Sequence, residues 1–228
     1  MLNLEELLCG DTRQMSSVIR YSSLPHGRGE NVAEHSFYVA FYALIIAKDL
    51  EQDGQKIDYE KLLVSALLHD LDEAITGDII RTVKYSSKEL RDRLGMVAEF
   101  YCKRTLAKFK VAKIEELFSC WDHARDPESL EGCILQLCDM LSVIAYCVER
   151  IKSGNVFMQT ILRGAHDNFI TKFKHPVYER YKAAIAEIVG RYAGHAPKQE
   201  MILIDEFNDG NPAEETQGGK KKKDRTTS

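Results

Sequence analysis

The chain has 228 residues, of which 44% are hydrophobic and 29% charged, and its formal net charge at pH 7 is −4. This length and mixture can bury a sizeable core and exclude a disordered, collagen-like or disulfide-dominated protein, so we expect one main domain. The acidic balance argues against a nucleic-acid or lipid-binding surface, because such surfaces normally carry a basic excess. Binding of small anions or of metal-bridged anions remains compatible with this acidic balance.

The hydrophobic pattern predicts an all-α protein, because apolar residues recur at helical spacing and strand-length alternation is almost absent. Asn31 followed by Glu34 is typical of a capping box and predicts a helix that runs to about Leu50. Its segment from Phe37 to Ala47 is apolar on every side, which predicts a buried central helix. Further helices are expected over residues 58–76, 87–109, 111–120, 126–152, 155–173 and 176–192.

The composition changes after about residue 198, where the chain becomes polar and ends in a lysine-rich segment. We therefore expect one domain over residues 1–198 and a disordered tail over residues 199–228. The run from Lys220 to Lys223 fits a nucleic-acid or targeting patch, but short charge runs at a chain end favour simple solvation.

Neither membrane insertion nor export is expected from the sequence. The longest uncharged apolar stretch, residues 37–47, is about half of the roughly 20 residues needed to span a bilayer. Residues 1–11 lack the basic cluster of a signal peptide. The six cysteines form no C-x-x-C pair and lie mostly among apolar residues. We expect them to be reduced and buried, in a cytoplasmic protein.

Three places put ionisable residues inside apolar segments, where burying an unpaired group is costly. His35 begins the expected central helix, and Asp139 interrupts the apolar run of residues 126–152. His69 and Asp70 directly follow another apolar run. Each residue alone also fits a hydrogen-bonded core position. Together, two imidazoles and two carboxylates favour a divalent metal site with positions left open for water and substrate.

Glu73 shares the face of His69 and Asp70 if the helix continues past them. At about 100° per residue, Asp70 lies about 100° and Glu73 about 40° from His69, with Leu67 among the apolar residues on the opposite side. A carboxylate in this position can handle the protons of a metal-bound water.

Three segments occur in a fixed order: Glu-Asn-Val-Ala-Glu-His-Ser (30–36), Leu-Leu-His-Asp-Leu-Asp-Glu-Ala-Ile-Thr-Gly-Asp (67–78) and Val-Lys-Tyr (83–85). In this combination the chain resembles the HD-domain phosphohydrolases, in particular their 5'-deoxynucleotidase branch, over roughly residues 10–190. The resemblance implies an all-α HD-domain bundle. It also implies a metal-dependent enzyme that removes phosphate from deoxyribonucleoside 5'-monophosphates.

The resemblance further implies which residues bind the metal. One divalent ion per chain would be held by His35, His69, Asp70 and Asp139. Its identity among Co, Mn, Mg, Fe, Ni and Zn stays open, because this ligand set suits all of them to different degrees. His123 could ligate a second metal, although a local cap with a nearby aspartate is the simpler interpretation.

The same resemblance implies roles for five other residues. Glu73 would be the acid/base residue, Arg20 would contact the substrate phosphate, and Asp78 would assist catalysis. Lys84 and Tyr21 would line the substrate site, where several relatives carry Trp at the position of Tyr21. Simpler roles also exist: a salt bridge for Arg20, a turn for Asp78, an exposed lysine for Lys84 and packing for Tyr21.

Two other functions stay open. A deoxynucleoside triphosphate phosphohydrolase of the same superfamily would need more cations, for which Arg28, Arg81, Lys84 and Arg125 are candidates. A catalytically silent regulatory module should lack a metal ligand or the acid/base carboxylate, and all five of these residues are present.

A homodimer is expected because residues 87–109 and 155–173 form amphipathic stripes and relatives are commonly dimers. The expected partner is a small deoxynucleotide, with no nucleic acid and no membrane.

Overall fold

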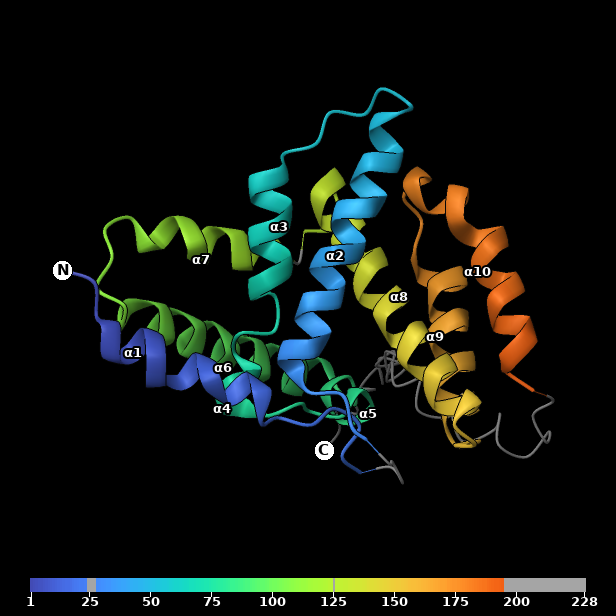
Figure 1. The fold of residues 1–228 in the computed structure, drawn as a ribbon, viewed down its shortest axis with the longest axis horizontal. Coiled ribbons are helices and arrows are strands. Elements are labelled where there is room, and N and C mark those ends of the chain that lie inside the picture. The colour runs from blue at the N-terminus through green and yellow to red at the C-terminus, as the bar shows by residue number, and fades with distance from the viewer. Residues whose placement is uncertain (24–27, 125, 195–228) are drawn as a thin grey trace, which may run out of the picture.

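The computed structural model describes residues 1–23, 28–124 and 126–194, and these residues form an all-helical fold without a β-strand (Figure 1). The tail expected beyond residue 198 and the candidate Arg125 lie outside the described residues. The α-helices are α1 (Leu4–Cys9), α2 (Val32–Glu51), α3 (Tyr59–Leu68), α4 (Glu73–Thr76), α5 (Arg81–Lys84), α6 (Lys88–Ala107), α7 (Ile114–His123), α8 (Leu130–Lys152), α9 (Met158–Lys172) and α10 (Glu179–Tyr192). Two 3-10 helices are η1 (Asp11–Ser16) and η2 (Pro176–Tyr178).

Side-chain caps fix where the long helices begin. The expected capping box is present at α2, where Asn31 Oδ1 accepts from the Glu34 N–H at 2.9 Å and Glu34 Oε2 accepts from the Asn31 N–H at 3.3 Å. Such a cap stabilises a helix by roughly 1 kcal/mol. Single side-chain caps are also present at the starts of α3, α6 and α8, where Asp58, Ser87 and Ser129 accept from a backbone N–H of the first turn.

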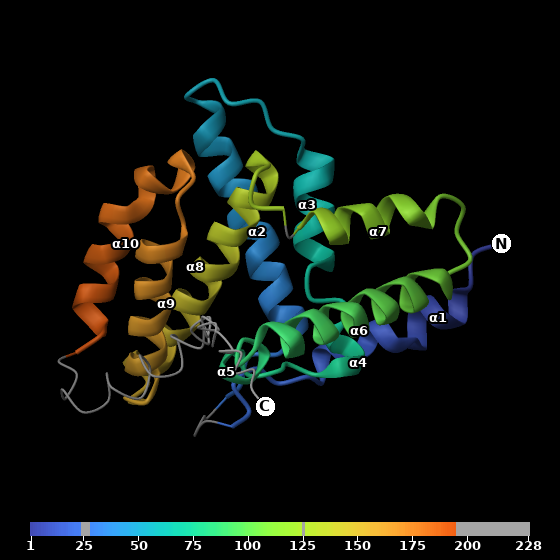
Figure 2. The same ribbon diagram turned by 180° about the vertical axis from the view of Figure 1, so that it is seen from behind.

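The helices form two layers with separate apolar cores (Figures 1 and 2). α2, α3 and α8 share one core with α9 and α10, whereas η1, α4, α6 and α7 enclose a second core around Trp121. The chain passes from one core to the other inside α2, where Val32 belongs to the second core and Val39 to the first. It does so again between Ala66 and Leu71. The segments that carry His35, His69 and Asp70 therefore lie at the junction of the two cores.

By length and composition alone, α8 could span a membrane. However, 61% of its most apolar window is buried inside the bundle. Packing against α2 and α9 accounts for its apolar character, and the helix presents Asp139 from the centre of the fold.

The single helix expected over residues 58–76 is wrong. α3 ends at Leu68, the chain turns through residues 69–72, and α4 follows and ends at Thr76, where Gly77 with a φ of +73° is the cap. In the turn, the Leu71 N–H donates to the Leu68 carbonyl, three residues back, so the helical register is lost. Leu71 is consequently buried in the second core, whereas Leu67, expected to be buried, is 53% exposed.

The expected full burial of α2 is also wrong. One face of this helix packs on α3 and α8, but Phe37, Tyr38, Phe41 and Ile45 on another face are between 46% and 61% exposed. The sequence pattern could not separate a helix buried on all sides from a helix with an uncovered apolar face.

Candidate active site

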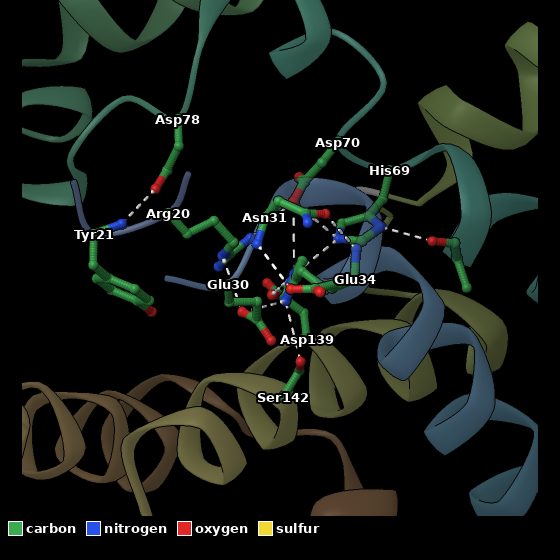
Figure 3. Close-up of polar contacts among 12 residues, drawn as sticks. Arg20, Tyr21, Glu30, Asn31, Glu34, His69, Asp70, Asp78, Asp139 and Ser142 are labelled. Atoms are coloured by element: carbon green, nitrogen blue, oxygen red, sulfur yellow. Dashed lines mark hydrogen bonds and ion pairs between the residues drawn. The ribbon is translucent and has the colours of Figure 1, made fainter. Parts of the chain in front are cut away.

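The four predicted metal ligands converge on one another. Three of them, His69, Asp70 and Asp139, are labelled in Figure 3. His35 Nε2 lies 3.4 Å from His69 Nε2, 3.6 Å from Asp70 Oδ2 and 3.2 Å from Asp139 Oδ1. Ligand atoms of His35, His69 and Asp70 all lie within 4.8 Å of one another. The Asp139 side chain is 49% exposed, so this side of the cluster is open to solvent and substrate.

The orientation of the two imidazoles suits a cation. His69 Nδ1 is 2.8 Å from the Ala66 carbonyl, which can only accept, so Nδ1 carries the proton. His69 Nε2 is thereby left to face His35 Nε2. Two facing ring nitrogens beside two carboxylates need a proton or a metal ion between them, which is the donor set of a divalent transition metal. The residues therefore fit the metal that the sequence predicts.

The electrostatics of the cluster also require positive charge. Burial alone would lower the pKa of His69, but the charges of Asp70 and Asp139 raise it to about 9. Burial alone would raise the pKa of Asp70, but His69, His35 and Arg20 hold it well below its usual value. The carboxylates of the cluster thus favour positive charge next to them, which a divalent ion would also supply.

Arg20 reaches the cluster from the segment before α2. Its backbone N–H donates to the Glu30 carbonyl at 2.9 Å, next to an antiparallel bridge between Ile19 and Asn31. Its Nη1 donates to Asp70 Oδ2 at 3.2 Å, and its Nε lies 3.6 Å from Glu30 Oε2. Arg20 is only 8% exposed. A surface salt bridge, the simpler role considered for this residue, does not describe such a buried position.

Glu73 is buried beside the cluster although the helix does not continue to it. It is 8% exposed, and its Oε2 has no hydrogen-bond partner among the described residues. Burial raises the pKa of Glu73 to about 10, with a further increase from the charge of Asp70, against the opposing charges of Arg20 and Lys84. A buried carboxyl that holds its proton and keeps a free oxygen can act as a proton donor or acceptor.

Asp78 and Tyr21 are joined directly. Asp78 Oδ2 accepts from the Tyr21 N–H at 3.2 Å (Figure 3). Tyr21 has a φ of +56°, a left-handed conformation that costs a tyrosine on the order of 1–3 kcal/mol. Its ring stacks on Tyr146 with centroids 5.5 Å apart and planes 8° apart. Asp78 and Tyr146 thus hold a strained turn that directly follows Arg20.

The remaining candidate cations differ in their surroundings. The Lys84 side chain makes no hydrogen bond or ion pair with the described residues, and its charge acts on Glu73. Arg28 instead pairs with Glu34 at 2.6 Å, and Arg81 donates to Asn168 on α9 at 3.3 Å.

The other histidines in the described part of the chain do not join the cluster. His123 Nδ1 lies 3.7 Å from Asp126 Oδ2, which fits the local cap rather than a second metal. His175 Nδ1 accepts from the Val177 N–H, and His166 lies next to Asp167.

Two buried residues at the cluster were not singled out from the sequence. Ser142 Oγ lies 3.1 Å from His35 Nδ1, and Glu30 Oε2 lies 3.7 Å from the same atom. Burial raises the pKa of Glu30 to about 7, against the opposing charge of Arg20. Ser142 stands one helical turn after Asp139, and this spacing is the signal that could have identified it.

Comparison with solved structures shows that this chain has the HD-domain fold. A crystal structure of a protein from Pyrococcus horikoshii is 23% identical with a TM-score of 0.66, covering 82% of this chain and 99% of that one. An HD-domain phosphohydrolase from Listeria innocua is 21% identical with a TM-score of 0.58, covering 82% of this chain and 98% of that one.

The family model described as 5'-deoxynucleotidase YfbR-like matches residues 10–187, so the chain belongs to this family of hydrolases. A 5'-deoxynucleotidase of Photorhabdus temperata is 28% identical over 144 residues, which are 62% of this chain and 72% of that one. A 5'-deoxynucleotidase of Yersinia pestis is 26% identical over the same shares. The all-α class and the enzyme family expected from the sequence are confirmed.

Proposed function

We propose that this protein is a metal-dependent 5'-deoxynucleotidase that hydrolyses deoxyribonucleoside 5'-monophosphates to deoxynucleosides and phosphate. The observation that carries the proposal is the convergence of His35, His69, Asp70 and Asp139 beside two functional side chains, the buried Arg20 and Glu73. We propose these four as the ligands of one divalent ion per chain. When bound, the ion supplies Lewis acidity toward phosphoryl oxygens and makes a water ligand more acidic.

The residues around the ligands have separate tasks in this proposal. Arg20 offsets charge on the phosphate, a task suited to its planar fork of donors. Lys84 provides a second cation that is free to approach the substrate. Glu73 exchanges a proton during cleavage of the bond between phosphorus and the 5' oxygen, and Asp78 holds the turn at Tyr21. Because Tyr21 follows Arg20, this turn fixes where the phosphate and the sugar lie relative to each other.

The surroundings of the cations favour a monophosphate over a triphosphate. Arg28 is already paired with Glu34, and Arg81 is bonded to Asn168. Arg20 also bonds to a carboxylate, but this carboxylate is that of Asp70 within the cluster, and the charge of Lys84 acts on Glu73 beside it. We assign these two cations to the substrate, and two cations suit the charge of a single phosphate group.

A product analysis separates the two substrate classes. The metal-loaded protein should release inorganic phosphate from deoxyribonucleoside 5'-monophosphates, measured by chromatography of a panel of deoxy- and ribonucleotides. Release of triphosphate from deoxynucleoside triphosphates, with no turnover of monophosphates, would favour the triphosphate phosphohydrolase. No turnover of any nucleotide would favour a regulatory module.

The second substrate prediction concerns Tyr21. If its ring fills the space of a ribose 2'-hydroxyl, Tyr21→Ala should raise kcat/KM on ribonucleotides relative to deoxynucleotides by a factor of about 5 to 150. Arg20→Ala should depress both alike, because it acts on the phosphate. Tyr101→Leu changes a tyrosine on α6, outside the turn at Tyr21, and serves as control. An unchanged ratio with reduced stability in Tyr21→Ala would assign the ring to packing alone.

We also propose a homodimer, formed through the exposed face of α2. Phe37, Phe41 and Ile45 share this face, and the rings of Phe37 and Phe41 stack 6.4 Å apart. Of the two stripes expected from the sequence, the one on α6 leaves Met96 and Phe100 exposed by 70% and 59%. The one on α9 offers less support, because Leu162 and Phe169 are fully buried within the bundle. Patches of exposed apolar side chains commonly mark such interfaces.

Light scattering tests the dimer and its face. The parent protein should have twice the 26.0 kDa chain mass, and Phe41→Glu should reduce it to one chain. Met96→Glu changes a residue of α6 that is 70% exposed and should leave the dimer intact. A dimer that persists in Phe41→Glu but dissociates in Met96→Glu would place the interface on α6. A monomeric parent protein would contradict the dimer.

The proposed partner is a small nucleotide rather than a nucleic acid, and the net charge of −4 supports this. The proposed location is the cytoplasm. All six cysteines are free and four of them are buried, which supports a reducing compartment.

A further inference from the structure

The ring of His35 is held from behind by two buried side chains. His35 Nδ1 lies 3.1 Å from Ser142 Oγ and 3.7 Å from Glu30 Oε2, while Nε2 on the opposite side faces the cluster. His35 is fully buried, and Ser142 and Glu30 are 1% and 8% exposed. The position of the ring proton is therefore decided inside the protein and not by solvent.

We propose that Ser142 and Glu30 are positioning residues that keep the proton of His35 on Nδ1, so that Nε2 retains its lone pair for a divalent cation. The inference rests on the proposed metal-dependent function and deepens it. Neither residue contacts the cation or the substrate in this arrangement. Each acts through His35.

Comparison of the two histidines shows why both residues are needed. The Ala66 carbonyl that accepts from His69 Nδ1 cannot donate, so it fixes the tautomer of that ring by itself. A serine hydroxyl can donate as well as accept, so Ser142 alone is compatible with either tautomer of His35. At pH 8, above the pKa of about 7 that burial gives Glu30, its carboxylate is mostly ionised, only accepts, and favours an N–H group on the side where it lies. The carboxylates on the Nε2 side, Asp139 and Asp70, are proposed ligands of the cation and face that cation when it is bound. Glu30 supplies this preference, and Ser142 supplies the shorter hydrogen bond.

The contacts of Glu30 also distinguish the two positioning residues from each other. Glu30 Oε2 lies 3.6 Å from Arg20 Nε, and this oxygen has no partner within hydrogen-bond distance among the described residues. Glu30 therefore stands between the proposed phosphate-binding arginine and a proposed metal ligand. The Ser142 hydroxyl, in contrast, makes its polar contact among the described residues with His35, a proposed metal ligand. A change at Glu30 should affect both cation and nucleotide binding, whereas a change at Ser142 should affect cation binding alone.

Calorimetric titration with Mn²⁺ tests the proposal without reference to activity. Ser142→Ala and Glu30→Gln should each bind Mn²⁺ roughly 10- to 100-fold more weakly than the parent, the usual effect of removing a partner of a metal-ligating histidine. Ser36→Ala is the matched control, because Ser36 adjoins His35 and is buried, but its hydroxyl has no partner among the described residues. It should bind Mn²⁺ like the parent. Glu30→Gln should in addition raise KM for the nucleotide.

The tautomer itself can be observed in parent protein loaded with diamagnetic Zn²⁺. Without a cation, Asp139 at 3.2 Å and Asp70 at 3.6 Å from Nε2 would favour a proton on that side of the ring. Two-bond ¹⁵N–¹H spectra of ¹⁵N-histidine-labelled protein at pH 8 should show His35 with its proton on Nδ1. In Glu30→Gln at the same Zn²⁺ concentration, a population with the proton on Nε2 should appear, because the new amide can donate to Nδ1. If the variants fail to fold, the parent spectrum still decides.

Two results would overturn the proposal: an Nε2–H tautomer of His35 in the Zn²⁺-loaded parent, or parent-like Mn²⁺ affinity in both folded variants. Failure to hydrolyse any nucleotide would contradict the proposed enzyme activity, but it would leave the Mn²⁺ and tautomer comparisons valid.

Discussion

Removal of divalent cations should reduce phosphate release by on the order of 10³-fold or more, since a metal ion contributes several kcal/mol to such reactions and each 1.36 kcal/mol is a factor of ten. Addition of Mn²⁺ or Co²⁺ should restore it. The physical reason is the charge of the cluster, in which Asp70 and Asp139 lie within 3.6 Å of His35 Nε2. A cation present at 100 times its Kd should also stabilise the fold by about 2.7 kcal/mol.

The divalent cations are removed with a chelator, and a pair of variants controls for unspecific effects of this chelator. Asp70→Asn removes one proposed ligand charge and should not recover activity when the cation is added back. Asp92→Asn changes an exposed aspartate on α6 and should recover like the parent. The measurements are phosphate release and the melting temperature, each before chelation, after chelation and after readdition. Full activity in the presence of the chelator would contradict the metal dependence.

Glu73→Gln should lower kcat by about 10²- to 10⁴-fold, the usual contribution of a positioned acid or base. The amide keeps the size of the side chain but can no longer take or return a proton. Metal content and KM should stay close to those of the parent, because Glu73 is assigned to the proton and not to the ion. Stability should not fall, since the buried carboxyl has an oxygen without a partner among the described residues.

The same substitution at an exposed position provides the comparison for Glu73. Glu89→Gln removes a carboxylate that pairs with Arg93 on the surface of α6 and should leave kcat unchanged. Elemental analysis of both variants gives the metal content, and steady-state kinetics gives kcat and KM. Loss of the metal from Glu73→Gln would reassign Glu73 as a ligand.

The sequence was sufficient to predict the class of fold and the candidate ligands. Helical periodicity identified the long helices, and the Asn31 to Glu34 box located the start of α2. His35 and Asp139 could be found because ionisable residues in apolar helices need partners. Several such residues in one chain can satisfy this need by lying together in one site. Each of these signals is local in sequence or depends on burial alone.

Other features could not be predicted because they depend on tertiary packing. The turn after α3 brings Leu71 into the second core and exposes Leu67, and a helical projection assumes that no such break occurs. Glu73 is buried next to the cluster through this turn, not through the helical face on which the expectation rested. Glu30 has no apolar run around it to mark it as buried. Its significance follows from its distances to Arg20 and His35.

The junction of the two cores has a consequence for motion. Apolar packing holds each layer together, but where His35, Asp70 and Asp139 meet, the contacts are between charged and polar groups. Such contacts tolerate small sliding and hinge displacements better than interlocked side chains do. Because α7 also packs on α3, we expect this displacement to be a small hinge movement about the contact between α3 and α7, which would widen the half-exposed side at Asp139. Nucleotide entry and product release would then depend on this small movement between the two layers.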